Sequence, residues 1–264
     1  MLKLAVVALV VFTLAVVMVM TGRGGGNFYV LTLVLAGTPM HEAATTGQFV
    51  LFSSSLAAML IFHRHKTVSW PLTLFIGGLT AVMAFVGGFA AHAFSGVALK
   101  IVFSLALVCA GTLMLWPAST SGAEPAQGRR YWRLRGNEGE YSIDLWVAMP
   151  VAMATGVCAG MVGVSGGSFL VPLMVLACRV PMRIAVGTAS TMVAATAFTG
   201  FLGHALHGTF NPSWAVPLAG VAVVGGILGG KTALKTRPTH LKTLFALTTL
   251  AAAIVMIANA LASA

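Results

Sequence analysis

LKIVFSLA at residues 99–106 returns as LKTLFALT at residues 241–248, with Leu, Lys and Phe in the same places. The two stretches lie 142 residues apart, and at that same offset Gly87–Gly88 matches Gly229–Gly230. Copies that keep a constant register over this distance indicate that the chain is built from a duplicated half.

The composition of the chain indicates a membrane protein. Of its 264 residues 58% are hydrophobic and 8% are charged, whereas about 25% charged is usual for a soluble domain. Short polar breaks separate ten apolar segments: 4–20, 27–38, 43–62, 70–92, 97–117, 143–162, 168–178, 184–203, 214–234 and 241–261. Most of them reach the ~20 residues that cross a hydrocarbon core, but 27–38 and 168–178 do not. The sequence predicts an all-α polytopic membrane protein, and a duplicated half in such a chain is typical of secondary transporters.

The net charge of +10 is concentrated in three stretches. Ten of the fifteen Lys and Arg residues are Arg64, Lys66, Arg129, Arg130, Arg133, Arg135, Lys231, Lys235, Arg237 and Lys242. Basic residues between apolar helices mark cytoplasmic loops and attract anionic lipid headgroups. We therefore expect a multi-pass protein of the cell (inner) membrane that contacts the lipid bilayer and binds no nucleic acid.

One linker divides the chain. Residues 118–141 are rich in Ser, Gly, Pro, Glu and Arg, and we expect them to be mobile and cytoplasmic. They separate a first transmembrane repeat (1–117) from a second (142–264). With all three basic stretches inside, both termini are predicted to lie outside.

The loop charges predict that the two repeats have opposite orientations in the membrane. The loop at 63–66 is basic, whereas its counterpart 204–213 has no Lys or Arg. Conversely, 231–242 is strongly basic and its counterpart at 89–100 carries only Lys100. Five segments in each half give the same result, since an odd number inverts the second copy. Whether the short segments span or re-enter the membrane is left open.

Each repeat has a glycine-rich break: GRGGGN at residues 22–27 and GVSGGS at 163–168. Glycine tolerates unwound backbone, and Asn27 and Ser168 are predicted to be the N-caps of the short helices that follow. A helix N-terminus favours anions, and unwound backbone at membrane depth must line a cavity or be buried. The two breaks are therefore expected to meet near the midplane. The alternative is that these glycines only permit close helix packing.

Residues 156–192 combine a Gly-rich break, Pro172 and a Pro-x-x-x-Ala-x-Gly-Thr-x-Ser run. The run consists of Pro181, Ala185, Gly187, Thr188 and Ser190. This combination resembles the signature of the sulfite exporter TauE/SafE family, and the resemblance extends over both repeats. It implies a membrane transporter of sulfur-containing and related organic anions. The first half departs from the pattern, with Leu31 in place of the proline, Thr45-Thr46-Gly47-Gln48 in place of residues 187–190, and an additional Arg23.

The predicted substrate site takes its residues from both breaks and from the helices that follow them. They are Arg23, Gly25, Gly26, Asn27, Thr46 and Gln48 in the first half, and Gly166, Gly167, Ser168, Thr188 and Ser190 in the second. Neutral hydroxyl and amide donors could coordinate an oxyanion without a buried fixed charge. For the Ser and Thr residues, the alternative is bonding within their own helix. For Arg23, the sequence slightly favours snorkelling to the membrane interface over pairing with the anion.

Other polar residues are expected to play smaller parts. Glu42, beside His41, could couple protons, but solvation in a loop is the preferred interpretation. His204 and His207 share a helix face without further ligands, so no metal site is predicted. The three cysteines are expected to pack as small hydrophobic side chains. We expect no cofactor and no enzymatic activity.

The transported substrate is predicted to be a small anion, such as sulfite, a sulfonate or a related oxyanion. Outside the linker the chain has only two carboxylates, Glu42 and Asp144. Uptake of an anion against the membrane potential needs coupling ions, which Asp or Glu usually hold, whereas export does not. The sequence thus favours an exporter or facilitator by alternating access. The alternatives are a transporter of organic carboxylates or other inorganic anions, and a membrane assembly subunit; homo-oligomerisation is left open.

Overall fold

A computed structural model describes residues 2–93, 108, 112, 131–136, 139–162, 165–178, 180–206 and 210–261. The predicted apolar segment 97–117, apart from residues 108 and 112, and linker residues 118–130 lie outside the described residues. The first half contains α1 (Leu2–Met20), α2 (Gly26–Leu35), α3 (Met40–Arg64), α4 (Trp70–Leu72), the π-helical turn η1 (Thr73–Gly77), α5 (Gly78–Ala90) and the 3-10 turn η2 (Ala91–Ala93).

The second half follows a β-hairpin made of β1 (Tyr131–Gly136) and β2 (Gly139–Asp144). Its helices are α7 (Leu145–Val162), α8 (Gly167–Pro172), the π-helical turn η3 (Leu173–Ala177), α9 (Met182–Ala205), α10 (Pro212–Lys235) and α11 (Pro238–Leu261). In the described part of the chain, seven helices are long and apolar enough to cross a membrane, with α4, η1 and α5 counted as one. These helices confirm the predicted all-α polytopic fold. Membrane-spanning segments form helices since a helix satisfies the backbone hydrogen bonds that lipid cannot.

The hairpin corrects the prediction that the whole linker is mobile. Its strands pair antiparallel, with Trp132 opposite Ile143, and an aromatic and a β-branched side chain stabilise such a pair. Ile143 is fully buried, and the Trp132 ring meets the Phe75 ring edge-on at 5.2 Å. The end of the linker is therefore an ordered hairpin that docks on the helices of both halves.

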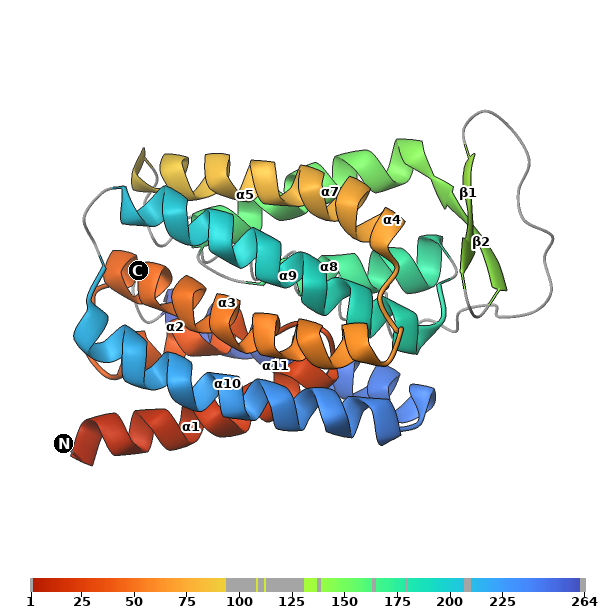
Figure 1. Ribbon diagram of the computed structural model, residues 1–264. Coiled ribbons are helices and arrows are strands. Elements are labelled where there is room, and N and C mark those ends of the chain that lie inside the picture. The colour runs from red at the N-terminus through yellow and green to blue at the C-terminus, as the bar shows by residue number, and fades with distance from the viewer. Residues whose placement is uncertain are drawn as a thin grey trace.

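The described parts of the three basic stretches, at residues 64–66, 131–135 and 231–242, lie at one end of the bundle, which we call the hairpin end (Figure 1). The loop after α3 approaches the start of α9 there, where Gly187 lies against the Thr67 carbonyl. The end of α10 also lies there, since Arg183 donates to the carbonyl of Thr236. At the opposite end, Glu42 at the start of α3 bonds Asn211 at the start of α10. This clustering agrees with the prediction that the three basic stretches lie on the same side of the membrane. Which side of the membrane the hairpin end faces stays a prediction.

The helices of the two halves run in opposite directions (Figure 1). Helices α1 and α3 run toward the hairpin end, whereas their counterparts α7 and α9 run away from it. Helix α5 runs away from the hairpin end, whereas its counterpart α10 runs toward it. The short helices do not continue across the bundle. Helix α2 returns to the end from which α1 came, where α3 begins, and α8 with η3 likewise returns to the hairpin end. Each short helix thus forms a hairpin with the long helix before it, and whether these hairpins re-enter the membrane stays a prediction.

Packing between the halves is reciprocal. Helix α1 packs on α10 and α5 packs on α7, while α3 and α9 pack on each other in the centre. A Cβ on Gly87 would touch the backbone of Val157, and a Cβ on Gly229 would touch that of Val16. These are corresponding pairs in the two copies, and small residues of this kind let membrane helices approach closely. The reciprocity supports the predicted inverted repeats, whose boundaries stay a prediction.

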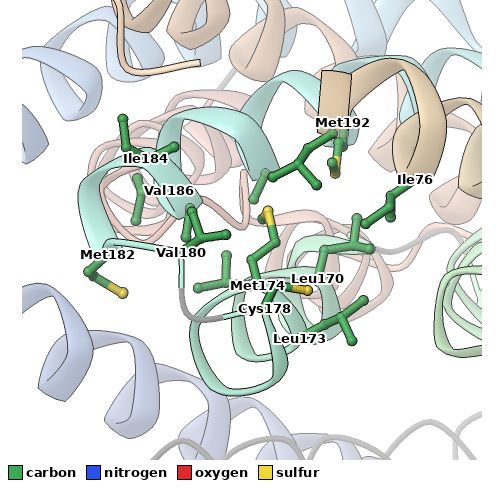
Figure 2. Packing of buried hydrophobic residues seen from close by; sticks show 14 of the residues in the cluster. Ile76, Leu170, Leu173, Met174, Cys178, Val180, Met182, Ile184, Val186 and Met192 are labelled. Atoms are coloured by element: carbon green, nitrogen blue, oxygen red, sulfur yellow. The ribbon is translucent and has the colours of Figure 1, made fainter. Parts of the chain in front are cut away.

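An apolar cluster fixes the α8–η3 segment against α9 (Figure 2). Leu170, Met174 and Cys178 from that segment meet Val186 and Met192 of α9. Cys178 is buried, as the packing interpretation predicted, and Cys158 is partly buried. This packing fixes the segment that follows the second break against α9.

Candidate functional site

The two glycine breaks are in contact. A Cβ on Gly167 would lie 2.6 Å from the carbonyl oxygen of Gly22, 2.9 Å from the Cα of Arg23 and 3.1 Å from a methyl of Val193. Val193 is the twelfth of the 24 residues of α9, which spans the bundle. The breaks therefore meet at about half the depth of the bundle.

Glycine is required in the first break by its backbone geometry. Gly22, Gly24 and Gly25 have φ angles of 77°, 68° and 94°, in the left-handed region that other residues avoid. The turn satisfies its own helix end, since the Met18 carbonyl accepts from the backbone N–H of Thr21 and of Arg23. This tight turn reverses the chain from α1 into α2.

The predicted N-caps are wrong. Gly25 and Gly166 occupy the cap positions of α2 and α8, and neither Asn27 nor Ser168 caps its helix. Each cap lies two residues earlier than expected, so Asn27 and Ser168 stand in the first turn of their helices. The Ser168 side chain is thereby free to reach across to the first break.

Arg23 does not snorkel to the interface. Its side chain is 1% exposed, and its Nε donates to Ser168 Oγ at 3.0 Å. Its Nη1 donates to Thr249 Oγ1 at 2.9 Å and to Thr248 Oγ1 at 3.3 Å, and Cζ lies 5.3 Å from the ring centroid of Phe245. The preferred sequence interpretation is wrong because the turn that carries Arg23 lies at mid-depth and its partners surround it there.

The partners of Arg23 solvate its charge without neutralising it. Thr249 donates its own hydroxyl proton to the carbonyl of Phe245 at 2.7 Å, and Thr248 donates to that of Leu244 at 2.7 Å. Their oxygen lone pairs are thus directed to the guanidinium. Among the described residues no carboxylate pairs with Arg23, and its Nη2 has no hydrogen-bond partner. A buried guanidinium with a free N–H is suited to an acceptor-only ligand, that is, to an anion.

Further buried polar atoms have no hydrogen-bond partner within the described ranges. They include Ser55 Oγ and Arg183 Nε, which lie outside the predicted site set. Four belong to that set: Asn27 Nδ2, Thr46 Oγ1, Gln48 Oε1 and Ser190 Oγ. Asn27 stands at the start of α2, one turn after Arg23, and offers a second free N–H donor. The other three lie on α3 and α9, the central pair of helices.

Thr188 makes a hydrogen bond that the sequence did not predict. Its Oγ1 accepts from the backbone N–H of Ser69 at 2.9 Å, which satisfies a donor just before α4. The contact lies near the hairpin end, and Thr188 is not among the partners of Arg23. The structure therefore assigns Thr188 to the junction between α9 and α4.

Replacing Thr188 by valine should lower the free energy of unfolding by about 1–3 kcal/mol, because the buried Ser69 N–H loses its acceptor. Thr188→Ser keeps the oxygen and should cost less. Thermal unfolding of both variants in detergent measures the difference. Equal melting temperatures for the two variants would contradict this role.

Gln48 caps the end of α7 together with His204. Gln48 Nε2 donates to the carbonyl of Ala159 at 3.2 Å, and His204 Nε2 lies 2.8 Å from that of Gly160. Both oxygens belong to the last turn of α7, where carbonyl groups need partners from outside the helix. Side chains of α3 and α9 thus hold the end of the helix that leads into the second break. No group of three potential metal ligands occurs in the described part of the chain, and His207 lies outside it.

Replacing Gln48 by methionine should lower the free energy of unfolding by about 1–3 kcal/mol, since the buried Ala159 carbonyl loses its donor. Thr32→Val is a suitable control, because the Thr32 hydroxyl bonds only to its own helix, at the carbonyl of Phe28. We expect the control to stay within about 0.5 kcal/mol of the parent. Unfolding monitored in one detergent compares the two, and a control that is equally damaging would refute the capping role.

Glu42 does not lie in a loop, as was preferred from the sequence. It stands in the first turn of α3, half-buried, and accepts from Asn211 Nδ2 at 2.9 Å. Asn211 also caps α10 by accepting from the N–H of Ser213. The pair joins the starts of α3 and α10, far along the bundle from Arg23.

Comparisons with known proteins point to one family. A family model described as "Sulfite exporter TauE/SafE" matches residues 7–256. "Probable membrane transporter protein YunE" of Bacillus subtilis is 26% identical over 221 residues, covering 79% of this chain and 80% of that protein. A "Probable membrane transporter protein" of Xylella fastidiosa (strain Temecula1) is 30% identical over 249 residues, covering 91% and 90%. No solved structure matches this chain.

Proposed function

Because the chain belongs to the sulfite exporter TauE/SafE family of membrane transporters, we propose that it carries a small anion, such as sulfite, a sulfonate or a related sulfur oxyanion. The anion binds where the two glycine breaks meet. Arg23 supplies the charge, and donors of the breaks, Asn27 among them, complete the coordination. The hairpin end faces the cytoplasm, and both termini lie outside.

The observation that carries this proposal is the buried Arg23. A charge in the membrane interior is costly and is a functional-site hypothesis by default. Here its partners are neutral acceptors and a ring face, and one of its N–H groups is free among the described residues. An anion that pairs with Arg23 lowers the cost of burying both charges.

The contacts around Arg23 also support alternating access. Arg23 belongs to the first half, whereas Ser168, Thr248 and Thr249 belong to the second. A relative movement of the halves therefore opens the anion site toward one side or the other, as in other inverted-repeat transporters. The central packing of α3 on α9 provides the contact about which they move.

Export is the direction that the charges favour. Moving an anion inward against a negative-inside potential costs about 2.3 kcal/mol per charge per 100 mV, and coupling ions usually supply it. Of the two carboxylates outside the linker, Glu42 is bonded to Asn211 at one end of the bundle and Asp144 caps the start of α7 at the other. Neither bonds to Arg23, and we propose an exporter or facilitator with weak or no cation coupling.

A thermal-shift screen of the purified full chain in detergent tests the function. Sulfite, thiosulfate, methanesulfonate, sulfate and acetate are compared at constant ionic strength, with chloride as the reference. A bound anion at 100 times its Kd stabilises by about 2.7 kcal/mol, which raises the melting temperature by several degrees. A shift with acetate alone would favour the carboxylate alternative. No shift with any anion would overturn the proposal and favour an assembly subunit.

A further inference from the structure

We propose that the carried species is a monovalent anion, and that it crosses the membrane with Arg23 as an electrically neutral complex. This inference rests on the proposed function and adds the charge of the substrate to it. It follows from the number of charges at the contact of the two breaks.

Arg23 supplies one positive charge, and no second buried charge accompanies it among the residues that the structure describes. Within the described residues, Arg23 is the one buried side chain among Lys, Arg, Asp and Glu. The other described Lys and Arg residues outside the hairpin are Lys3, Arg64, Lys66, Arg183, Lys231, Lys235, Arg237 and Lys242, all at or near helix ends. A dianion at the site would therefore retain one uncompensated negative charge at mid-depth, which is strongly unfavourable.

The two copies of the repeat differ in charge at the position of Arg23. In the first break Arg23 follows the first glycine, and in the second break Val164 stands at the corresponding place. The duplicated sequence thus has an arginine at one of two equivalent positions and an apolar residue at the other. The second half contributes the neutral Ser168, Thr248 and Thr249 instead.

A neutral loaded complex determines which step responds to the membrane potential. The empty carrier keeps the positive Arg23, so a negative-inside potential draws the empty site back toward the cytoplasm. Net export then accelerates with the potential, whereas one-for-one exchange of the same anion on both sides, which never moves the empty carrier, does not respond.

Two anions of similar shape and different charge test the valence. Methanesulfonate carries one negative charge and sulfate carries two. We expect the full chain in detergent to bind methanesulfonate at least about 10-fold more tightly at equal ionic strength, since the second charge of sulfate lacks a partner. Tighter binding of sulfate would overturn the inference but leave the proposed function standing. The absence of binding by every anion in the screen would overturn both.

The exchange rate in proteoliposomes gives an independent readout. Labelled methanesulfonate is exchanged at zero potential and at about −100 mV, set with potassium and valinomycin. We expect the rate to change by less than about twofold. If the loaded complex carried one net charge through the whole field, the rate would change up to about 50-fold, and that result would refute neutrality.

A matched pair of variants places a carboxylate or an amide beside the same guanidinium. Thr249→Asp puts a permanent negative charge where Arg23 Nη1 now meets a hydroxyl at 2.9 Å. It should weaken methanesulfonate binding at least about 10-fold, since the single positive charge is then neutralised. Thr249→Asn has a similar shape without the charge, and we expect it to lose much less affinity than Thr249→Asp does. Parental affinity in a folded Thr249→Asp protein would overturn the inference.

Discussion

Replacing Arg23 by methionine should raise the melting temperature of the anion-free protein and at the same time abolish the anion-induced shift. The two effects have opposite signs because they have different origins. Methionine removes an uncompensated buried charge, and replacing buried ions by apolar side chains is often stabilising by about 1–4 kcal/mol. The anion, however, loses its charged donor, which is worth about 1.5–3 kcal/mol or roughly 10- to 150-fold in Kd.

The opposite signs separate a ligand-binding residue from a structural one. If the bonds of Arg23 to Ser168 and Thr249 chiefly held the two breaks together, the methionine variant would melt at a lower temperature. Arg23→Lys is the matched control: it keeps the charge but has no planar fork of donors, so we expect intermediate affinity. A methionine variant that keeps the full anion-induced shift would place the site elsewhere.

The helical spans were predictable from sequence because lipid leaves the backbone few alternatives. Segments of about 20 apolar residues must form helices to satisfy their N–H and C=O groups. The glycine breaks were predictable for a related reason, since three residues of the first turn need positive φ angles. Both features depend on residues that are close together in the sequence.

The environment of Arg23 was not predictable in this way. Its partners Ser168 and Thr249 lie 145 and 226 residues away along the chain. Seen beside its neighbours in sequence, an arginine at the end of an apolar helix indicates snorkelling. The duplicated stretch 241–248 marked α11 as part of a repeat, but only its packing shows that it supplies the Phe245 ring and the Thr248 hydroxyl.

The same limit applies to Gln48 and Thr188. As polar residues next to the breaks, both were placed in the anion site. The structure engages each with the backbone of a distant element, at Ala159 and at Ser69, and their part in anion binding stays a prediction. Buried backbone groups at helix ends need partners, and a sequence does not reveal which side chains will satisfy them.

Replacing Gly167 by alanine should abolish anion transport. The added Cβ would lie 2.6 Å from the Gly22 carbonyl oxygen and 2.9 Å from the Arg23 Cα, both of them backbone atoms that cannot rotate away. The two breaks must separate, and Arg23 Nε then loses its 3.0 Å bond to Ser168. Overpacking of this kind costs about 1–3 kcal/mol, so we expect a lower melting temperature as well as flux in proteoliposomes reduced to background.

Gly220→Ala is the matched control for this substitution. Gly220 lies on the exposed face of α10, and no described atom would come within 4 Å of its added Cβ. The same methyl group should there be neutral or stabilising by up to about 1 kcal/mol, since alanine favours a helix over glycine. If both alanine variants transport equally well, close approach of the two breaks is not required. If only Gly167→Ala fails, contact at that one glycine, rather than a general need for glycine in membrane helices, is what transport requires.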